Sequence, residues 1–149
     1  MSDLRTTLAV RKAIDRQIDA LIRAAAKNVT MLKGVEMKQN QIRNAVNVAN
    51  ATESMEAVTN FIRYQIGRDR RWHAFGKAVI DDIEAGAVKM ALDAVLRAEP
   101  EADCVSTRAE LTRLYLGYLN RCFVYADKSE DWQDLSARFD RCEEGQTHV

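Results

Sequence analysis

The sequence of 149 residues contains one proline and six glycines, so few positions interrupt a helix or form a tight turn. Helix-favouring alanine, leucine, arginine and glutamate recur throughout. No apolar run reaches the roughly 18 residues that a membrane-spanning helix needs. The first residues are charged throughout and lack the apolar core of a signal peptide. We therefore expect a helical, cytoplasmic protein with no membrane contact.

Residues that commonly carry catalysis are scarce. The three cysteines, Cys104, Cys122 and Cys142, show no CxxC or Cys/His spacing, which argues against a disulfide framework. His73 and His148 are the only histidines. There is no glycine-rich phosphate loop, HExxH motif or Ser-His-Asp arrangement. We expect no enzyme activity, no catalytic residue, no metal site and no cofactor.

One acidic group lies within the helical region 70–98. Asp81 and Glu84 are three residues apart and share a helix face with Asp82 beside them. Two carboxylates without further ligands make a weak Mg²⁺ site. We interpret the group as a solvated acidic face, with a docking surface for a basic partner or a metal site as alternatives.

Apolar residues recur every three or four positions in most of the chain, which predicts helices. The pattern predicts a long helix over 4–32, a short one over 39–49, one from about Thr52 to Gly67, and one or two between 70 and 98. A capping box, Thr107 to Glu110, predicts the start of the next helix, and a last helix is expected over 130–142. No alternating run predicts a strand. We expect an all-α fold: a single domain over 1–149, a bundle of about five to six helices, with a frayed tail at 143–149.

The net charge of zero conceals an asymmetry along the chain. Residues 1–75 contain 13 basic and 7 acidic residues, a net charge of +6, whereas residues 76–149 contain 9 and 15, a net charge of −6. Such a division predicts a polyanionic partner for the first half or head-to-tail contact between copies. The alternative is a chance distribution over a solvated surface.

Arginines concentrate in one predicted turn. Arg68, Arg70 and Arg71 are opposed there only by Asp69, and Arg63 lies about one helical turn earlier. Arginine in the first turn of a helix opposes the helix dipole, which favours acidic residues. A bound phosphate would reverse this cost, since backbone N–H groups, dipole and guanidinium groups would converge on it. The alternative is that these arginines pair with carboxylates of the same protein. A weaker basic and polar set surrounds the preceding short helix: Lys33, Lys38, Gln41 and Arg43.

The run "LKGVEMKQNQIRNAVNVAN", followed by "FIRYQIGRDRRWHAFGKAVIDDI", resembles the small helical subunit of type III-A (Csm-type) CRISPR effector complexes. The segment "RAELTRLYLGYLNRCFVYADK" is similar to the closing helix of that family. The likeness spans Leu32 to Lys128, and the helix predicted beyond it is an addition to the family pattern.

The resemblance implies a non-catalytic, all-α subunit of a guided ribonucleoprotein in antiviral defence. Several copies would stack along the complex, contacting one another, other effector subunits and the backbone of the guide RNA and target RNA. Carried over to matching positions, it implies six RNA-backbone contacts: Lys38, Arg43, Arg63, Arg68, Arg70 and Arg71. Sequence-independent binding of a guide–target duplex relies on phosphate contacts.

Two other functions remain open from the sequence. The stretch "VTMLKGVEMKQNQIRNAVNVA" is compatible with a helix-turn-helix DNA-binding regulator in which Gln39, Gln41 and Arg43 read bases. A structural interaction subunit without nucleic-acid contact would instead pair its arginines internally.

Overall fold

The computed structural model describes residues 2–137 of the chain, with side chains from Thr7 onward. Within that range it contains seven complete α-helices, two 3₁₀ turns, a further helical stretch over 132–137 and no strand. The α-helices are α1 (Ser2–Asp15), α2 (Ile18–Val29), α3 (Gln39–Asn50), α4 (Met55–Arg68), α5 (His73–Glu84), α6 (Ala87–Ala98) and α7 (Cys104–Ser129). The 3₁₀ turns are η1 (Thr30–Leu32) and η2 (Arg70–Trp72). The all-α expectation is confirmed, but the count exceeds the five to six helices predicted.

The first additional helix comes from a break in the long helix predicted over 4–32. The chain turns at Arg16 and Gln17, where the Gln17 amide bonds the Ile14 carbonyl at 2.9 Å. This break lets α1 pack against α6 while α2 packs along α7. Leu8 is consequently 54% exposed although it fits the apolar pattern.

The second break separates α5 from α6, which settles the region 70–98 as two helices. The amides of Ala85 and Gly86 both bond the Asp81 carbonyl, which ends α5. A Cβ atom at Gly86 would lie 2.9 Å from Asp82 Oδ1 and 3.1 Å from Asp82 Cα. A side chain at position 86 would therefore push this part of the chain away from Asp82.

Two helices are capped at other residues than predicted, four positions earlier for α7 and two positions later for α4. α7 begins at Cys104 because Asp103 caps it, its Oδ2 accepting the Ser106 amide at 2.8 Å. Thr107 is instead buried within the first turns of this helix. Likewise α4 is capped by Ser54 rather than Thr52, and it continues past Gly67 to Arg68.

The last predicted helix is described only in part. Residues 132–137 are helical, and Leu135 is buried against the core. The rest of the predicted segment 130–142 and the expected frayed tail 143–149 lie outside the described residues. None of the described helices combines the length and apolar character needed to cross a membrane.

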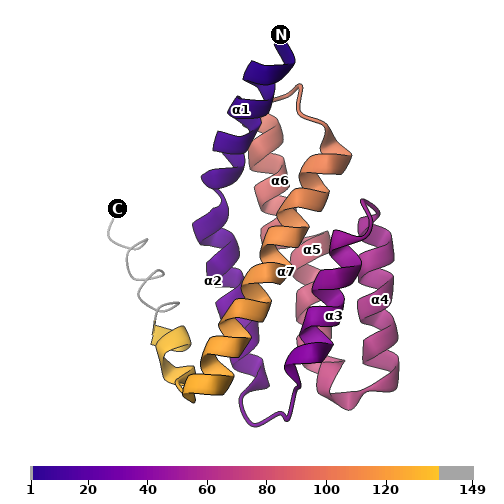
Figure 1. Cartoon of the computed structure of the whole chain (residues 1–149), viewed down its shortest axis with the longest axis vertical. Helices are drawn as coiled ribbons and strands as arrows, with labels where there is room; N and C mark the ends of the chain where they lie inside the picture. The colour runs from indigo at the N-terminus through magenta and orange to yellow at the C-terminus, as the bar shows by residue number, and fades with distance from the viewer. Residues whose placement is uncertain (1, 138–149) are drawn as a thin grey trace.

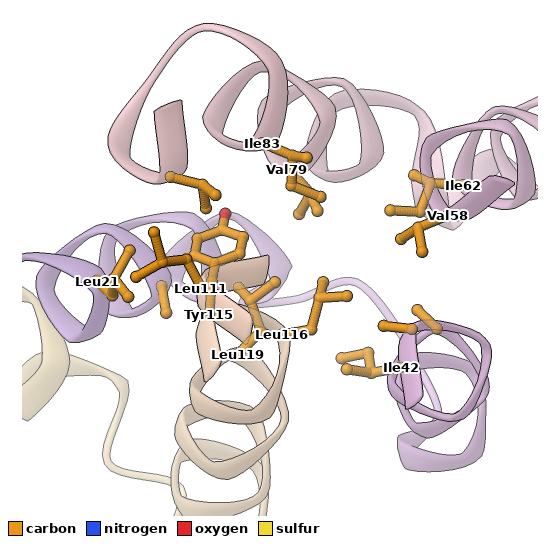
Figure 2. Close-up of a cluster of buried hydrophobic side chains, with 14 of the residues drawn as sticks. Leu21, Ile42, Val58, Ile62, Val79, Ile83, Leu111, Tyr115, Leu116 and Leu119 are labelled. Carbon is orange, nitrogen blue, oxygen red and sulfur yellow. The ribbon is translucent and has the colours of Figure 1, made fainter. Parts of the chain in front are cut away.

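Helix α7 is the centre of the bundle (Figure 1). It packs against α2, α3 and α6, while α4 packs on α5 and α3. In Figure 2, Tyr115 of α7 lies with Leu21 of α2 on one side and Val79 and Ile83 of α5 on the other. The buried side chains form one continuous cluster contributed by all seven helices. The apolar period of the sequence therefore identifies most of the core correctly.

A polar network crosses this core. Asp82 Oδ2 accepts hydrogen bonds from Tyr115 Oη and from Asn28 Nδ2, both at 2.6 Å, and Asn28 Nδ2 also lies 3.0 Å from Tyr115 Oη. Tyr115 is fully buried and Asn28 is 8% exposed. The network joins α2, α5 and α7, and satisfies polar groups that would be costly to bury unpaired.

The network predicts an unusual pH dependence of stability. Burial raises the pKa of Asp82 above 3.8, despite opposing hydrogen bonds from Tyr115, the Ala87 amide and Asn28. The folded protein therefore binds this proton more tightly than the unfolded chain does. The contribution of Asp82 to stability should fall as pH rises from about 3.8 through its folded pKa, then stay constant.

The measurement is urea unfolding of the wild type and Asp82→Asn between pH 3 and 7. The free energy of unfolding of the wild type minus that of the variant should decline across this window. Subtracting the variant removes the contribution of the other carboxylates. A difference that rises with pH would show that the hydrogen bonds outweigh burial.

Candidate nucleic-acid interface

The arginine-rich turn between α4 and α5 is built around Asp69. The backbone of Asp69 is extended after the last residue of α4, and its carboxylate accepts the Arg71 amide at 3.0 Å. The Trp72 amide bonds the Asp69 carbonyl, and the His73 amide bonds the Arg70 carbonyl. Asp69 is therefore the N-cap of η2, which directly precedes α5.

The phosphate site expected at this helix start requires free backbone amides, and these hydrogen bonds occupy three of them. The amides of Arg71, Trp72 and His73 are all engaged within the turn. The Asp69 carboxylate thus occupies the position where a bound anion was expected. Any phosphate bound here must be held by side-chain cations rather than by these amides.

Arg71 is the most constrained of the predicted RNA contacts. Its Nε and Nη2 donate to the Asp69 carboxylate at 2.7 to 3.1 Å, and its Nη1 donates to the Glu36 carbonyl at 2.9 Å. The hydrogen bonds from Arg71 lower the pKa of Asp69, and Asp69 raises the pKa of Arg71. Arg71 therefore holds η2 against the loop that precedes α3.

Replacing Arg71 should reduce stability more than replacing its neighbour. Arg71→Ala removes the link between η2 and the loop at Glu36, so its midpoint of thermal unfolding should fall below that of the wild type. Arg70→Ala is the matched control, because the Arg70 side chain is exposed and forms no ion pair with a described residue. Thermal unfolding followed by circular dichroism compares the two. Equal midpoints would contradict a structural role for Arg71.

The Arg71 bridge brings four predicted site residues to one end of the bundle. Lys38 directly precedes α3, Arg68 ends α4, and Arg70 stands beside Arg71 in η2. These helix ends lie toward the bottom of Figure 1. We call Lys38, Arg68, Arg70 and Arg71 the basic end. The segments 33–43 and 68–71 that surround it contain six basic and two acidic residues, a net charge of +4.

Three cations of the basic end are available at the surface. Lys38, Arg68 and Arg70 are exposed, and none forms an ion pair with a described residue. The Arg68 guanidinium lies 5.5 Å from the centre of the Tyr64 ring, and its Nη1 is 3.5 Å from Tyr64 Oη. Tyr64 is 59% exposed. The sequence signal for this contact is the spacing of four residues between Tyr64 and Arg68, which places both on one helix face.

The remaining two predicted RNA contacts, Arg43 and Arg63, lie on α3 and α4 outside the basic end. Arg43 is exposed on α3, about one turn from its start. Arg63 is exposed on α4, and its Nη2 lies 2.9 and 3.1 Å from the two carboxylate oxygens of Glu84. Both partners of this pair are substantially exposed, so the pair contributes little stability and exchanges readily with another anion.

The acidic group near the end of α5 is divided among different roles. Asp82 belongs to the buried network, and Glu84 pairs with Arg63. Across the described residues, no three histidine, cysteine or acidic side chains are grouped closely enough to hold a metal ion. His73 is exposed at the start of α5, while His148 lies beyond the described residues.

The geometry around α3 does not favour the DNA-binding regulator. Six residues separate η1 from α3, whereas a helix-turn-helix usually has a turn of about three to four residues. Gln39 and Gln41 are half-buried, and Gln41 Oε1 is buried without a hydrogen-bond partner. Of the three residues proposed to read bases, Arg43 alone is fully on the surface.

Comparisons of the chain with protein-family models, with curated proteins and with solved structures found no match. What the protein does must therefore be inferred from its own residues. The feature with the clearest chemical meaning is the basic end, where exposed cations gather on a rigidly held turn.

Proposed function

We propose that this protein is a non-catalytic RNA-binding subunit that contacts phosphates through its basic end. The observation that carries the proposal is the grouping of Lys38, Arg68 and Arg70, which are exposed and have no carboxylate partner among the described residues. Lysine and arginine side chains of this kind bind nucleic-acid backbones without reading sequence. Arg71 contributes by fixing the turn, and Arg43 and Arg63 extend the basic surface at its flanks.

The more specific proposal is the small subunit of a type III-A CRISPR ribonucleoprotein. Support comes from the resemblance of residues 32–128 to that family and from the division of charge between the two halves of the chain. In this role several copies stack along the complex, and the basic end contacts the backbone of the guide RNA paired with its target. Cleavage belongs to other subunits, and the protein serves antiviral defence in the cytoplasm.

A structural subunit without nucleic-acid contact is the second candidate. It is favoured by two internal ion pairs, Arg71 with Asp69 and Arg63 with Glu84. These pairs involve two of the six predicted RNA contacts. The other four, Lys38, Arg43, Arg68 and Arg70, form no ion pair with a described residue.

Fluorescence anisotropy with labelled single-stranded RNA, an RNA duplex and a random DNA duplex separates these functions. The proposal predicts binding of RNA irrespective of sequence, with an affinity that falls steeply as salt increases. Tighter binding of the DNA duplex than of either RNA would favour a regulator. Absence of binding to all three at low salt would favour the structural subunit.

A further inference from the structure

A groove lies at the end of the bundle opposite the basic end. Helix α1 packs against α6, whereas α2 packs along α7, so α1 diverges from the first turns of α7 (Figure 1). The groove between them has a volume of about 380 Å³. It is also bounded by the loop that precedes α7.

The groove contains a line of apolar side chains. Val10, Ile14 and Ile18 are spaced by four residues along α1 and the start of α2, and Leu114 of α7 also lines the groove. Ile14 is 9% exposed, while the other three are half-buried and leave part of their apolar surface in water. An amphipathic segment presents side chains at matching intervals.

The groove is also strongly acidic. Asp15, Glu101, Asp103 and Glu110 line it and are exposed, with Arg11 as the one cation among its lining residues. The lining therefore carries a net charge of −3. None of these four carboxylates forms an ion pair with a described residue. The Ser106 amide and hydroxyl lower the pKa of Asp103.

We propose that this groove, which we call the acidic groove, docks a cationic amphipathic segment of a partner protein. Leucine-like side chains of that segment would cover Val10, Ile14 and Leu114, and its lysine or arginine groups would pair with the surrounding carboxylates. Charge complementarity selects this occupant, because an apolar segment alone leaves the carboxylates unpaired and a metal ion lacks a grouped ligand set among the described residues. This inference is independent of RNA binding by the basic end.

A second copy of the chain fits the groove less well. The exposed large apolar side chains of the described residues are single residues on α1, η1, α4 and α6 and two residues twenty positions apart on α7, so no helix presents two of them one turn apart as a docking segment would. They are Leu8, Met31, Tyr64, Met90, Val105 and Tyr125. Single exposed apolar residues of this kind are ordinary surface features.

The test uses a fluorescein-labelled amphipathic peptide of leucine and lysine, about four helical turns long, and its counterpart with glutamate in place of lysine. Anisotropy measures the affinity of the full-length protein for each peptide. The double variant Asp15→Lys/Glu110→Lys reverses two groove charges. The control Glu53→Lys/Asp127→Lys makes the same change in net charge at exposed positions outside the groove. Val10→Thr tests the apolar line at nearly constant shape.

We expect the lysine peptide to bind and the glutamate peptide not to bind. The groove double variant should weaken binding at least about tenfold and Val10→Thr about threefold, while the control stays within about twofold of the wild type. An equal loss in the control, or no effect of Val10→Thr, would overturn the proposal by showing nonspecific charge attraction. Self-association of the wild type in sedimentation velocity that the groove variant abolishes would also overturn it, by assigning the groove to a second copy.

Discussion

Replacing Asp82 with alanine is expected to lower the free energy of unfolding by about 2–3 kcal/mol. The change removes the acceptor for Tyr115 Oη and Asn28 Nδ2, which both lie 2.6 Å from Asp82 Oδ2. Tyr115 and Asn28 are buried, so water cannot readily replace the carboxylate. Each buried group left unpaired costs about 1–3 kcal/mol, and relief of the desolvated carboxylate offsets part of that sum.

Asp81→Ala is the matched control, because Asp81 is the adjacent residue and its side chain is exposed. It should change the free energy of unfolding by less than about 0.5 kcal/mol. Tyr115→Phe should fall between the two variants, because Asp82 then keeps its bond from Asn28. Urea unfolding at neutral pH, followed by circular dichroism, measures all three. Similar losses for Asp81→Ala and Asp82→Ala would contradict the importance of the network.

Replacing Lys38, Arg68 and Arg70 together with alanine is expected to weaken binding of single-stranded RNA at least about tenfold at moderate salt. These residues are the exposed cations of the basic end, and each is available for one phosphate contact. The fold should survive, since none of the three has an ion pair with a described residue and Arg71 still holds the turn. Circular dichroism should therefore show unchanged helix content.

The control for this variant removes three cations elsewhere. Lys12, Arg16 and Arg97 are exposed on α1, just after it, and at the end of α6. Their triple alanine variant has the same net charge as the basic-end variant, so long-range attraction to RNA is reduced equally. Its affinity should remain within about threefold of the wild type. An equal loss in both triple variants would indicate diffuse attraction instead of a site.

Local sequence patterns predicted the features that depend on neighbouring residues. The period of apolar residues predicts α3 and most of the core, because side chains three or four positions apart share one helix face. Helix capping is also a local rule, but it predicted the wrong start for α7 because two possible caps, Asp103 and Thr107, lie close together. Asp103 accepts a hydrogen bond from the Ser106 amide, whereas Thr107 is buried in the core.

Features that depend on tertiary contacts were not visible in the sequence. Arg71 bonds a backbone carbonyl 35 residues away, at Glu36. Arg63 pairs with Glu84, 21 residues away, on a neighbouring helix. Every residue has a backbone carbonyl, so no sequence pattern could identify the Glu36 carbonyl as the partner of Arg71. The acidic groove likewise exists only because α1 diverges from α7.

The salt dependence of RNA affinity tests the central claim most directly. The logarithm of the binding constant for single-stranded RNA is measured against the logarithm of salt concentration for the wild type and both triple variants. Each phosphate contact contributes a slope of about −0.7, so loss of Lys38, Arg68 and Arg70 should make the slope shallower by about 2. The control slope should match that of the wild type. If the basic-end variant kept the wild-type slope, these residues would not contact RNA phosphates and the proposed function would be wrong.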